Sequence, residues 1–151
     1  MSTMRPRRVY LPLSPDGLVA LARDRSLAAP ARGFAATPGR ADPRRSTSAE
    51  EEAEYAAFAA AAALAHESDP GQRRIVVAAD APASILEEVE PAADGPTGIV
   101  TTAGLPLRFI VSVHIDEADA GSADPSSADP LDLLWYDITE LDAVLEDLAS
   151  D

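Results

Sequence analysis

Residues 73–79 read Arg73-Arg74-Ile75-Val76-Val77-Ala78-Ala79, two arginines followed by five consecutive apolar residues. No polar residue alternates with the apolar ones, so neither side of this segment is suited to contact with water. A short run of this kind is typical of a strand that other elements cover on both faces. The segment therefore predicts a central strand, around which the rest of the fold is arranged.

Further strands are predicted at residues 7–13, 33–37, 97–102, 107–116 and 131–138. In the first of them, alternation places Val9 and Leu11 on one face and Tyr10 on the other. Residues 103–106 fit the connection of a hairpin between the strands at 97–102 and 107–116. In the fourth strand, alternation predicts two faces: Leu107, Phe109, Val111, Val113 and Ile115 on one, and Arg108, Ile110, Ser112, His114 and Asp116 on the other.

Three helices are predicted from their capping residues. Ser14 is a good N-cap, and Pro15 suits the first helical position that follows it. Ser48 and Glu51 fit a capping box, and the helix that they begin extends to about His66. Thr139 with Asp142 predicts the cap of a closing helix.

Apolar stripes indicate which faces of the longer helices are buried. In the helix that ends near His66, the predicted face consists of Tyr55, Phe58, Ala59 and Ala62. In the closing helix, it consists of Leu141, Val144, Leu145 and Leu148.

These elements predict a single α/β domain over residues 1–151. The expected architecture is an α/β sandwich, a mixed sheet of about five or six strands with two or three helices packed mainly on one face. The order of the strands does not follow from the sequence. Residues 38–47 and 117–130 are predicted to be flexible loops, since the second of them is too poor in large apolar residues to offset its ordering entropy.

Charge is the clearest functional signal, because the chain of 151 residues carries a net charge of −14. Residues 1–45 contain nine arginines against three acidic residues, and the remainder contains three arginines against 23 acidic residues. Such a surface opposes direct binding to nucleic acid, which requires cations that displace counterions from phosphates. A basic protein is the expected partner, while the plainer interpretation is that acidity keeps an alanine-rich domain soluble.

Composition also excludes several classes of site. The chain has no cysteine, so disulfides, thiolate nucleophiles and sulfur-ligated zinc are ruled out. No cofactor is expected. The acidic group Asp116, Glu117 and Asp119 fits no calcium-binding loop and is interpreted as a solvated charge run. No segment is long and apolar enough to span a membrane, and the basic start of the chain does not resemble a signal peptide, so a cytoplasmic location is expected.

His114 and Asp116 are the most suggestive candidates for catalysis, with Ser112 two residues before the histidine and Arg108 on the same predicted face. Residues two apart on a strand lie about 6.5–7 Å apart at the backbone, so a hydrogen-bonded triad is not expected. A half-exposed structural histidine is the favoured interpretation. His66 is interpreted as a cation at the end of its helix.

Trp135 and Tyr136 are candidates for a partner interface, since the only tryptophan of the chain stands beside one of three tyrosines. Aromatic pairs of this kind anchor many protein interfaces. The alternative is that one ring packs in the core while the other covers its edge.

Short segments along the whole chain resemble a domain-of-unknown-function family of high-GC Gram-positive (actinobacterial) bacteria. They are residues 8–13, 33–38, 54–56, 73–80, 113–116, 134–136 and 140–141. The chain departs from the family between His114 and Trp135, where family members tend to carry an alanine-rich helix. The resemblance implies homology and carries over no catalytic residue, ligand or partner.

Three functions follow in order of preference. The first is a non-enzymatic interaction or regulatory protein that binds a basic protein partner. The second is a small enzyme with its site around Arg108, His114 and Asp116. The third is a nucleic-acid mimic, which requires acidic side chains along one face of the molecule. The oligomeric state is left open.

Overall fold

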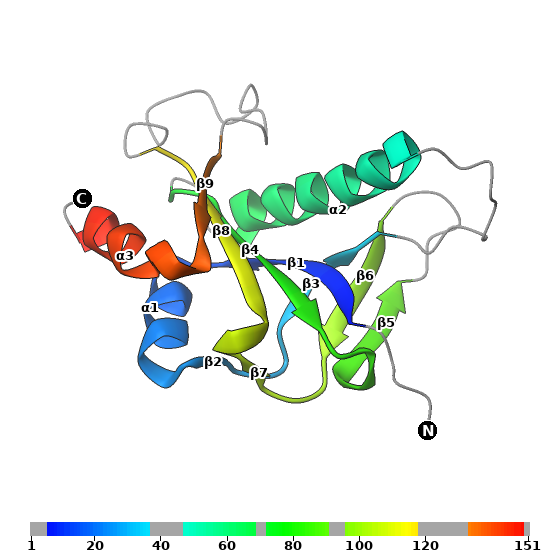
Figure 1. Ribbon diagram of the computed structural model, residues 1–151, viewed down its shortest axis with the longest axis horizontal. Helices are drawn as coiled ribbons and strands as arrows, with labels where there is room; N and C mark the ends of the chain where they lie inside the picture. The colour runs from blue at the N-terminus through cyan, green and yellow to red at the C-terminus, as the bar shows by residue number, and fades with distance from the viewer. Residues whose placement is uncertain (1–5, 37–46, 69–71, 91–95, 118–132, 150–151) are drawn as a thin grey trace.

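The structure, a computed structural model, describes residues 6–36, 47–68, 72–90, 96–117 and 133–149 (Figure 1). The strands of the main sheet are β1 (Arg7–Leu13), β3 (Arg32–Ala35), β4 (Ile75–Ala81), β5 (Leu86–Glu90), β6 (Thr97–Thr101), β8 (Ile110–Ile115) and β9 (Leu134–Asp137). Their order across this seven-stranded sheet is β5-β6-β3-β1-β4-β8-β9. A two-stranded sheet pairs β2 (Ser26–Leu27) with β7 (Leu105–Pro106).

Three helices cover the main sheet: α1 (Pro15–Asp24), α2 (Thr47–Ser68) and α3 (Leu141–Ala149). Figure 1 shows α2 on one side of the sheet and α1 with α3 on the other. The predicted α/β class, with helices packed against a sheet, is confirmed.

Strand β4 confirms the prediction from the apolar run. Ile75 and Val77 lie in the larger core beneath α1 and α3, whereas Val76 and Ala78 lie in the smaller core beneath α2. All four side chains are buried. A strand with both faces covered needs no polar alternation, which explains its composition.

The architecture differs from the prediction in three details. Every pairing in the main sheet is antiparallel rather than mixed, there are seven strands, and the helices are divided between both faces. The pairing follows from the path of the chain. Because α2 carries the chain past β1, β3 and β4 run in the same direction on either side of β1, which runs in the opposite direction.

The predicted hairpin between residues 97–102 and 107–116 is wrong. Strand β6 pairs with β3 and β5, whereas β8 pairs with β4 and β9. The chain between them leaves the main sheet to form β7 and the 3-10 turn η2 (Leu107–Phe109). Strand β5, which was not predicted, is rich in glutamate, and such charged strands are common at the edge of a sheet.

A β-bulge in β8 changes the predicted faces of that strand. Ala78 pairs with Ser112 and Ala79 with Ile110, so Val111 is the extra residue. Ile110 therefore joins Val113 and Ile115 in the larger core, instead of sharing a face with Ser112.

The helix starts are partly as predicted. Ser14 caps α1, with its hydroxyl accepting a hydrogen bond of 2.9 Å from the amide of Gly17. At the closing helix the capping box is formed by Asp137 and Glu140 rather than by Thr139 and Asp142, because the 3-10 turn η6 (Ile138–Glu140) precedes α3. The predicted stripe of α3 packs on the larger core.

The buried face of α2 is rotated relative to the prediction. Ala57, Ala61 and Ala62 are fully buried, while Tyr55 is 41% exposed. Alanine permits close contact between a helix and a sheet, so the small side chains face the strands and the tyrosine lies at the border. Helix α2 begins at Thr47, so the predicted cap Ser48 lies within the helix, and its side chain is outside the described ones. Of the two predicted flexible loops, only the end residues Thr47 and Glu117 belong to the part of the chain that the structure describes.

Candidate functional site

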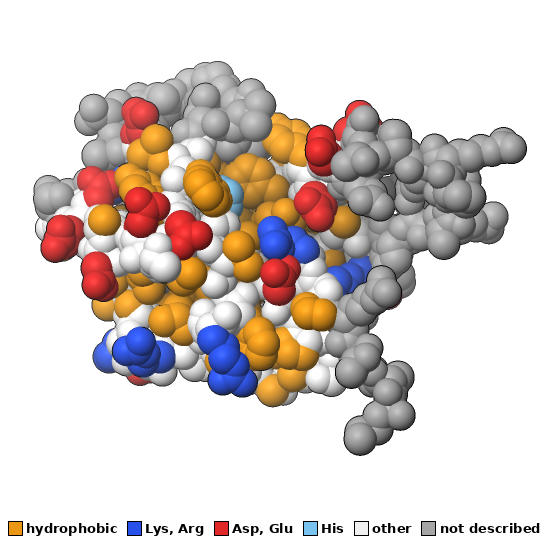
Figure 2. Space-filling view, viewed as in Figure 1, with side chains coloured by type: hydrophobic (Ala, Val, Ile, Leu, Met, Phe, Trp, Pro, Cys, Tyr) orange, Lys and Arg blue, Asp and Glu red, His pale blue; other side chains and the backbone are white. Residues whose placement is uncertain are grey.

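A groove with a volume of about 260 Å³ lies between α2 and the strands β1, β4, β8 and β9. Helix α2 contributes Glu51, Glu54, Tyr55 and Phe58. The strands contribute Arg8, Tyr10, Ala78, Ser112, His114 and Trp135. On this face of the molecule, Figure 2 shows hydrophobic, acidic and basic side chains next to one another, with a histidine among them.

The register of the sheet explains why the groove exists. Ala78 of β4 pairs with Tyr10 of β1 on one side and with Ser112 of β8 on the other. These three residues form a row across the face that α2 covers. Since alanine is the smallest of the three, the row is hollow at its centre, between larger neighbours.

An ion pair borders the groove on the β1 side. Arg8 donates to both carboxylate oxygens of Asp80, with distances of 2.6 Å from Nε and 3.2 Å from an Nη atom. The bidentate contact raises the pKa of Arg8 above its ordinary value, and the guanidinium remains charged. Because Asp80 balances it, Arg8 adds no net charge to the groove.

Ser112 and His114 are joined by a hydrogen bond of 2.9 Å between Oγ and Nε2. The expectation that residues two apart on a strand would not reach each other is therefore wrong for this pair. Their backbones are separated by two strand positions, but the imidazole is long enough to lean back along β8 to the hydroxyl. Asp116 does not take part.

His114 is held neutral by its surroundings. Its ring lies 4.9 Å from that of Phe58, measured between centroids, and Trp135 is its register partner on β9. Burial, together with the positive charge of Arg8, lowers the pKa of His114 to about 4. At neutral pH the imidazole thus brings no charge to the groove, and it donates a hydrogen bond at one ring nitrogen and accepts one at the other.

We expect this neutral histidine to reduce stability in mild acid. Unfolded histidine has a pKa of about 6.5, whereas His114 titrates at about 4 in the folded protein. Between these values the unfolded chain binds the proton more readily. The histidine therefore leaves stability unaffected above pH about 6.5 and lowers it by about 3 kcal/mol as the pH drops to 4. Urea unfolding of wild type and His114→Gln across this range measures the effect, and equal pH slopes for the two proteins contradict it.

The outer border of the groove combines carboxylates with exposed aromatic rings. Trp135 is 63% exposed and Tyr55 is 41% exposed. Among the described residues these are two of four exposed large hydrophobic side chains, so half of that set lines one groove. Within the same described part of the chain, Glu51 and Glu54 form no ion pair. Burial, together with the charge of Glu54, raises the pKa of Tyr10.

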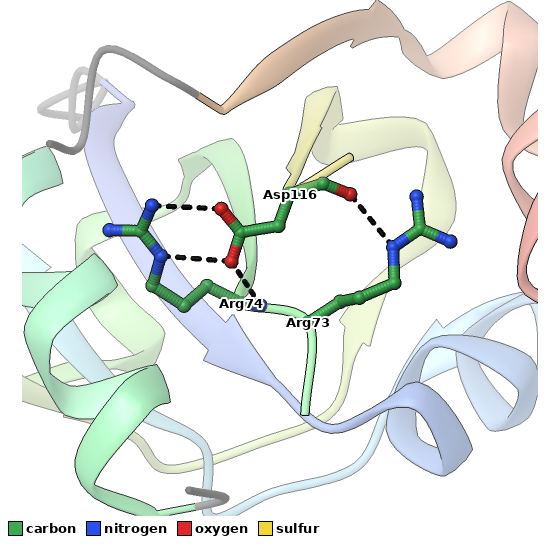
Figure 3. Close-up of polar contacts among 3 residues, drawn as sticks. All are labelled: Arg73, Arg74 and Asp116. Carbon is green, nitrogen blue, oxygen red and sulfur yellow. Dashed lines mark hydrogen bonds and ion pairs between the residues drawn. The ribbon is translucent and has the colours of Figure 1, made fainter. Parts of the chain in front are cut away.

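Asp116 lies outside the groove, in a buried polar cluster (Figure 3). Its carboxylate accepts two hydrogen bonds from the Arg74 guanidinium, of 2.9 Å and 2.8 Å, and one of 2.7 Å from the Arg74 amide. The Asp116 carbonyl accepts a bond of 2.8 Å from Arg73, which also pairs with Asp147 of α3. The cluster joins the start of β4 to the end of β8 and to α3. These contacts give Asp116 a role in stabilising the fold.

The remaining sequence candidates are also separated from His114. Arg108 belongs to η2 and lies over the ring of Phe109, 4.8 Å from its centroid, so it does not share a face with the histidine. Tyr136 packs against the larger core, whereas its neighbour Trp135 faces the groove. His66 lies in the last turn of α2.

Seven of the ten residues that line the groove were not identified as site residues from the sequence: Arg8, Tyr10, Glu51, Glu54, Tyr55, Phe58 and Ala78. The placement of Tyr10 opposite Val9 and Leu11 was the only available signal. Without the strand order, nothing connects that face of β1 to His114 on β8.

Neither metal nor membrane features are found in the described residues. No group of three or more His, Asp or Glu side chains within them is arranged to hold a metal ion. No helix there has the length and apolar character needed to cross a membrane.

Comparison with known proteins identifies a family. Residues 7–145 match the model of a family of unknown function, DUF6912, and so cover nearly all of the chain. No curated protein and no solved structure matches.

Proposed function

We propose that this chain, which belongs to the DUF6912 family of unknown function, is a non-enzymatic binding protein whose groove receives a lysine or arginine side chain of a basic protein partner. One observation carries the proposal: two carboxylates that form no ion pair among the described residues, and two exposed aromatic rings, border the same hollow.

The charges of the groove favour a cation. Arg8 is balanced by Asp80, and His114 is neutral at pH 7 because of its low pKa. Glu51 and Glu54 then leave the groove with net negative charge. A bound cationic side chain would compensate this charge at a site partly shielded from water, where electrostatic attraction is stronger than in bulk solvent.

The aromatic rings supply the second component. A lysine ammonium or an arginine guanidinium binds favourably over the face of a tryptophan or tyrosine ring, by roughly 0.5–2 kcal/mol. Trp135 and Tyr55 lie at the border of the groove, where a side chain entering from solvent meets them first. Contacts between these rings and the methylene groups of the bound lysine or arginine would add apolar burial to the electrostatic attraction.

The charge of the whole protein supports the same partner. A net charge of −14 raises the rate at which a basic protein encounters the surface, and the attraction weakens as salt is added. The groove then provides the short-range contacts that long-range attraction lacks.

Catalysis is less well supported. Of the enzyme site proposed around Arg108, His114 and Asp116, only the histidine lies in the groove. The Ser112–His114 hydrogen bond is the one feature that favours a hydrolase. A base with a pKa of about 4 is too weak to activate a serine hydroxyl efficiently at neutral pH, and the Ser112 side chain is buried.

A nucleic-acid mimic is also less well supported, because acidic side chains of α2 and α3 lie over opposite faces of the sheet. The proposal includes the cytoplasmic location and the actinobacterial family range that the sequence leads us to expect.

Binding of a fluorescent arginine-rich peptide tests the proposal, with affinity measured by anisotropy at low and at physiological salt. We expect the double variant Glu51→Gln/Glu54→Gln to bind about tenfold more weakly, corresponding to about 1.4 kcal/mol. The reduction should be smaller at high salt, since added ions screen the same attraction.

The matched control is Glu87→Gln/Asp142→Asn, which removes the same charge from exposed positions outside the groove. It should reduce the affinity only slightly. If both double variants lose affinity equally, only the overall charge matters and the groove is not the binding site.

A further inference from the structure

A second cavity, with a volume of about 460 Å³, lies at the C-terminal end of α1. It is formed where η2 approaches η6. Its apolar lining comes from Pro106, Leu107, Ile110 and Ile138. Cavities of about 300–1,000 Å³ with an apolar lining and a few polar groups are typical sites for small molecules.

Two arginines, Arg25 and Arg108, line this cavity, and their lack of ion pairs is unusual in so acidic a protein. Neither forms an ion pair with any residue in the part of the chain that the structure describes, and both are exposed. Each of the other described arginines has an ion pair or another interaction within the protein. Figure 2 shows basic side chains along the lower left edge of the molecule, below most of the acidic ones on that face.

The backbone at Arg25 is held in an unfavourable conformation. This residue ends α1 with φ of 55°, the left-handed region in which glycine is strongly preferred. Its carbonyl accepts a hydrogen bond of 3.0 Å from the amide of Leu107, which fixes α1 to η2. A glycine would satisfy this geometry with less strain, so the arginine side chain is the feature that needs an explanation.

Arg108 lies over the Phe109 ring, with Cζ 4.8 Å from the ring centroid. This contact uses no hydrogen-bond acceptor, and the guanidinium N–H groups have no acceptor within the described residues. Thr139, the third polar residue of the cavity, gives both its amide and its hydroxyl to Asp137, and these bonds lower the pKa of that carboxyl. The two arginines are therefore the available donors.

We propose that this cavity binds a small amphipathic carboxylate, with the carboxylate held by Arg25 and Arg108 and an aliphatic chain lying on the apolar lining. Arginine presents paired donors that match the geometry of a carboxylate, and the lining buries the methylene groups. This site is separate from the groove, and the inference does not depend on the proposed function.

Isothermal titration calorimetry tests the inference. The full chain is titrated with octanoate and with octanol, each below its micellar or solubility limit. Octanoate should bind with 1:1 stoichiometry and at least roughly tenfold more tightly than octanol, since only octanoate engages the arginines. Arg25→Gly and Arg108→Gln should each weaken octanoate binding roughly tenfold. Arg23→Gln is the matched control, because Arg23 is an exposed arginine of the same helix end that pairs with Asp24 outside the cavity.

Arg25→Gly also separates binding from folding. It should raise Tm by roughly 2 °C, because glycine relieves the backbone strain at this position. Loss of binding in a protein that is more stable cannot be attributed to unfolding. The inference is overturned if wild type does not bind octanoate, if octanol binds as tightly, or if the two cavity variants behave as Arg23→Gln does.

Discussion

Replacing Asp116 with asparagine is expected to lower the free energy of unfolding by about 3–5 kcal/mol. The side chains of Asp116 and Arg74 are each only 8% exposed, so neither is solvated by bulk water. The asparagine removes the negative charge with which Asp116 compensates the buried Arg74 guanidinium. Because small domains are stable by only about 5–15 kcal/mol, this loss is a large part of the total. Urea unfolding followed by far-UV circular dichroism measures it.

The exposed ion pair between Arg23 and Asp24 provides the control, with side chains 71% and 55% exposed. Asp24→Asn should leave the unfolding midpoint unchanged, because water solvates both partners. If Asp116→Asn is equally harmless, the buried cluster does not hold β4 to β8 as described.

Gly33→Ala is expected to reduce stability by about 2–3 kcal/mol. Gly33 of β3 lies so close to β1 that a Cβ atom would overlap the carbonyl oxygen of Tyr10 and lie 2.6 Å from Cδ2 of Leu11. The first of these atoms belongs to the backbone and cannot rotate away, so β3 and β1 must separate. Since Tyr10 lines the groove, binding of the arginine-rich peptide should weaken as well.

Gly104→Ala is the matched control for this substitution. Its nearest neighbour would be the Ser26 hydroxyl oxygen at 3.2 Å, which a small rotation can move, and Gly104 is exposed. Thermal denaturation of both variants should show a clear decrease in Tm for Gly33→Ala only. A similar decrease for both would mean that the close contact between β3 and β1 is not the cause.

Local patterns predicted much of the fold. The apolar run of β4, the alternation in β1 and the Ser14 cap each depend on neighbouring residues, and all three are confirmed. Strand order and pairing depend on contacts between distant segments, which local patterns do not contain. The predicted hairpin was wrong for this reason. Strand β5 was not predicted because its glutamates do not give the apolar pattern of a strand, and it pairs only with β6 at the edge of the sheet.

The candidate site was predicted less well than the fold. Two of the predicted candidates, His114 and Trp135, are register partners across β8 and β9. The predicted grouping of the histidine with Arg108 and Asp116 does not occur. The bulge at Val111 and the turn η2 place Arg108 at the second cavity instead of the groove. Asp116 forms a buried ion pair with Arg74. Glu51 and Glu54 reach the groove only through the packing of α2 on the sheet.

The fluorescence of Trp135 tests the proposed groove most directly, because this residue is the only tryptophan in the chain and lies at the border of the groove. Titration of wild type with an arginine-rich peptide free of aromatic residues should produce a saturable change in its emission. The same titration of Glu51→Gln/Glu54→Gln should require roughly tenfold more peptide to reach half of that change. Saturable binding detected by anisotropy while the emission of Trp135 stays constant would contradict the assignment of the groove as the binding site.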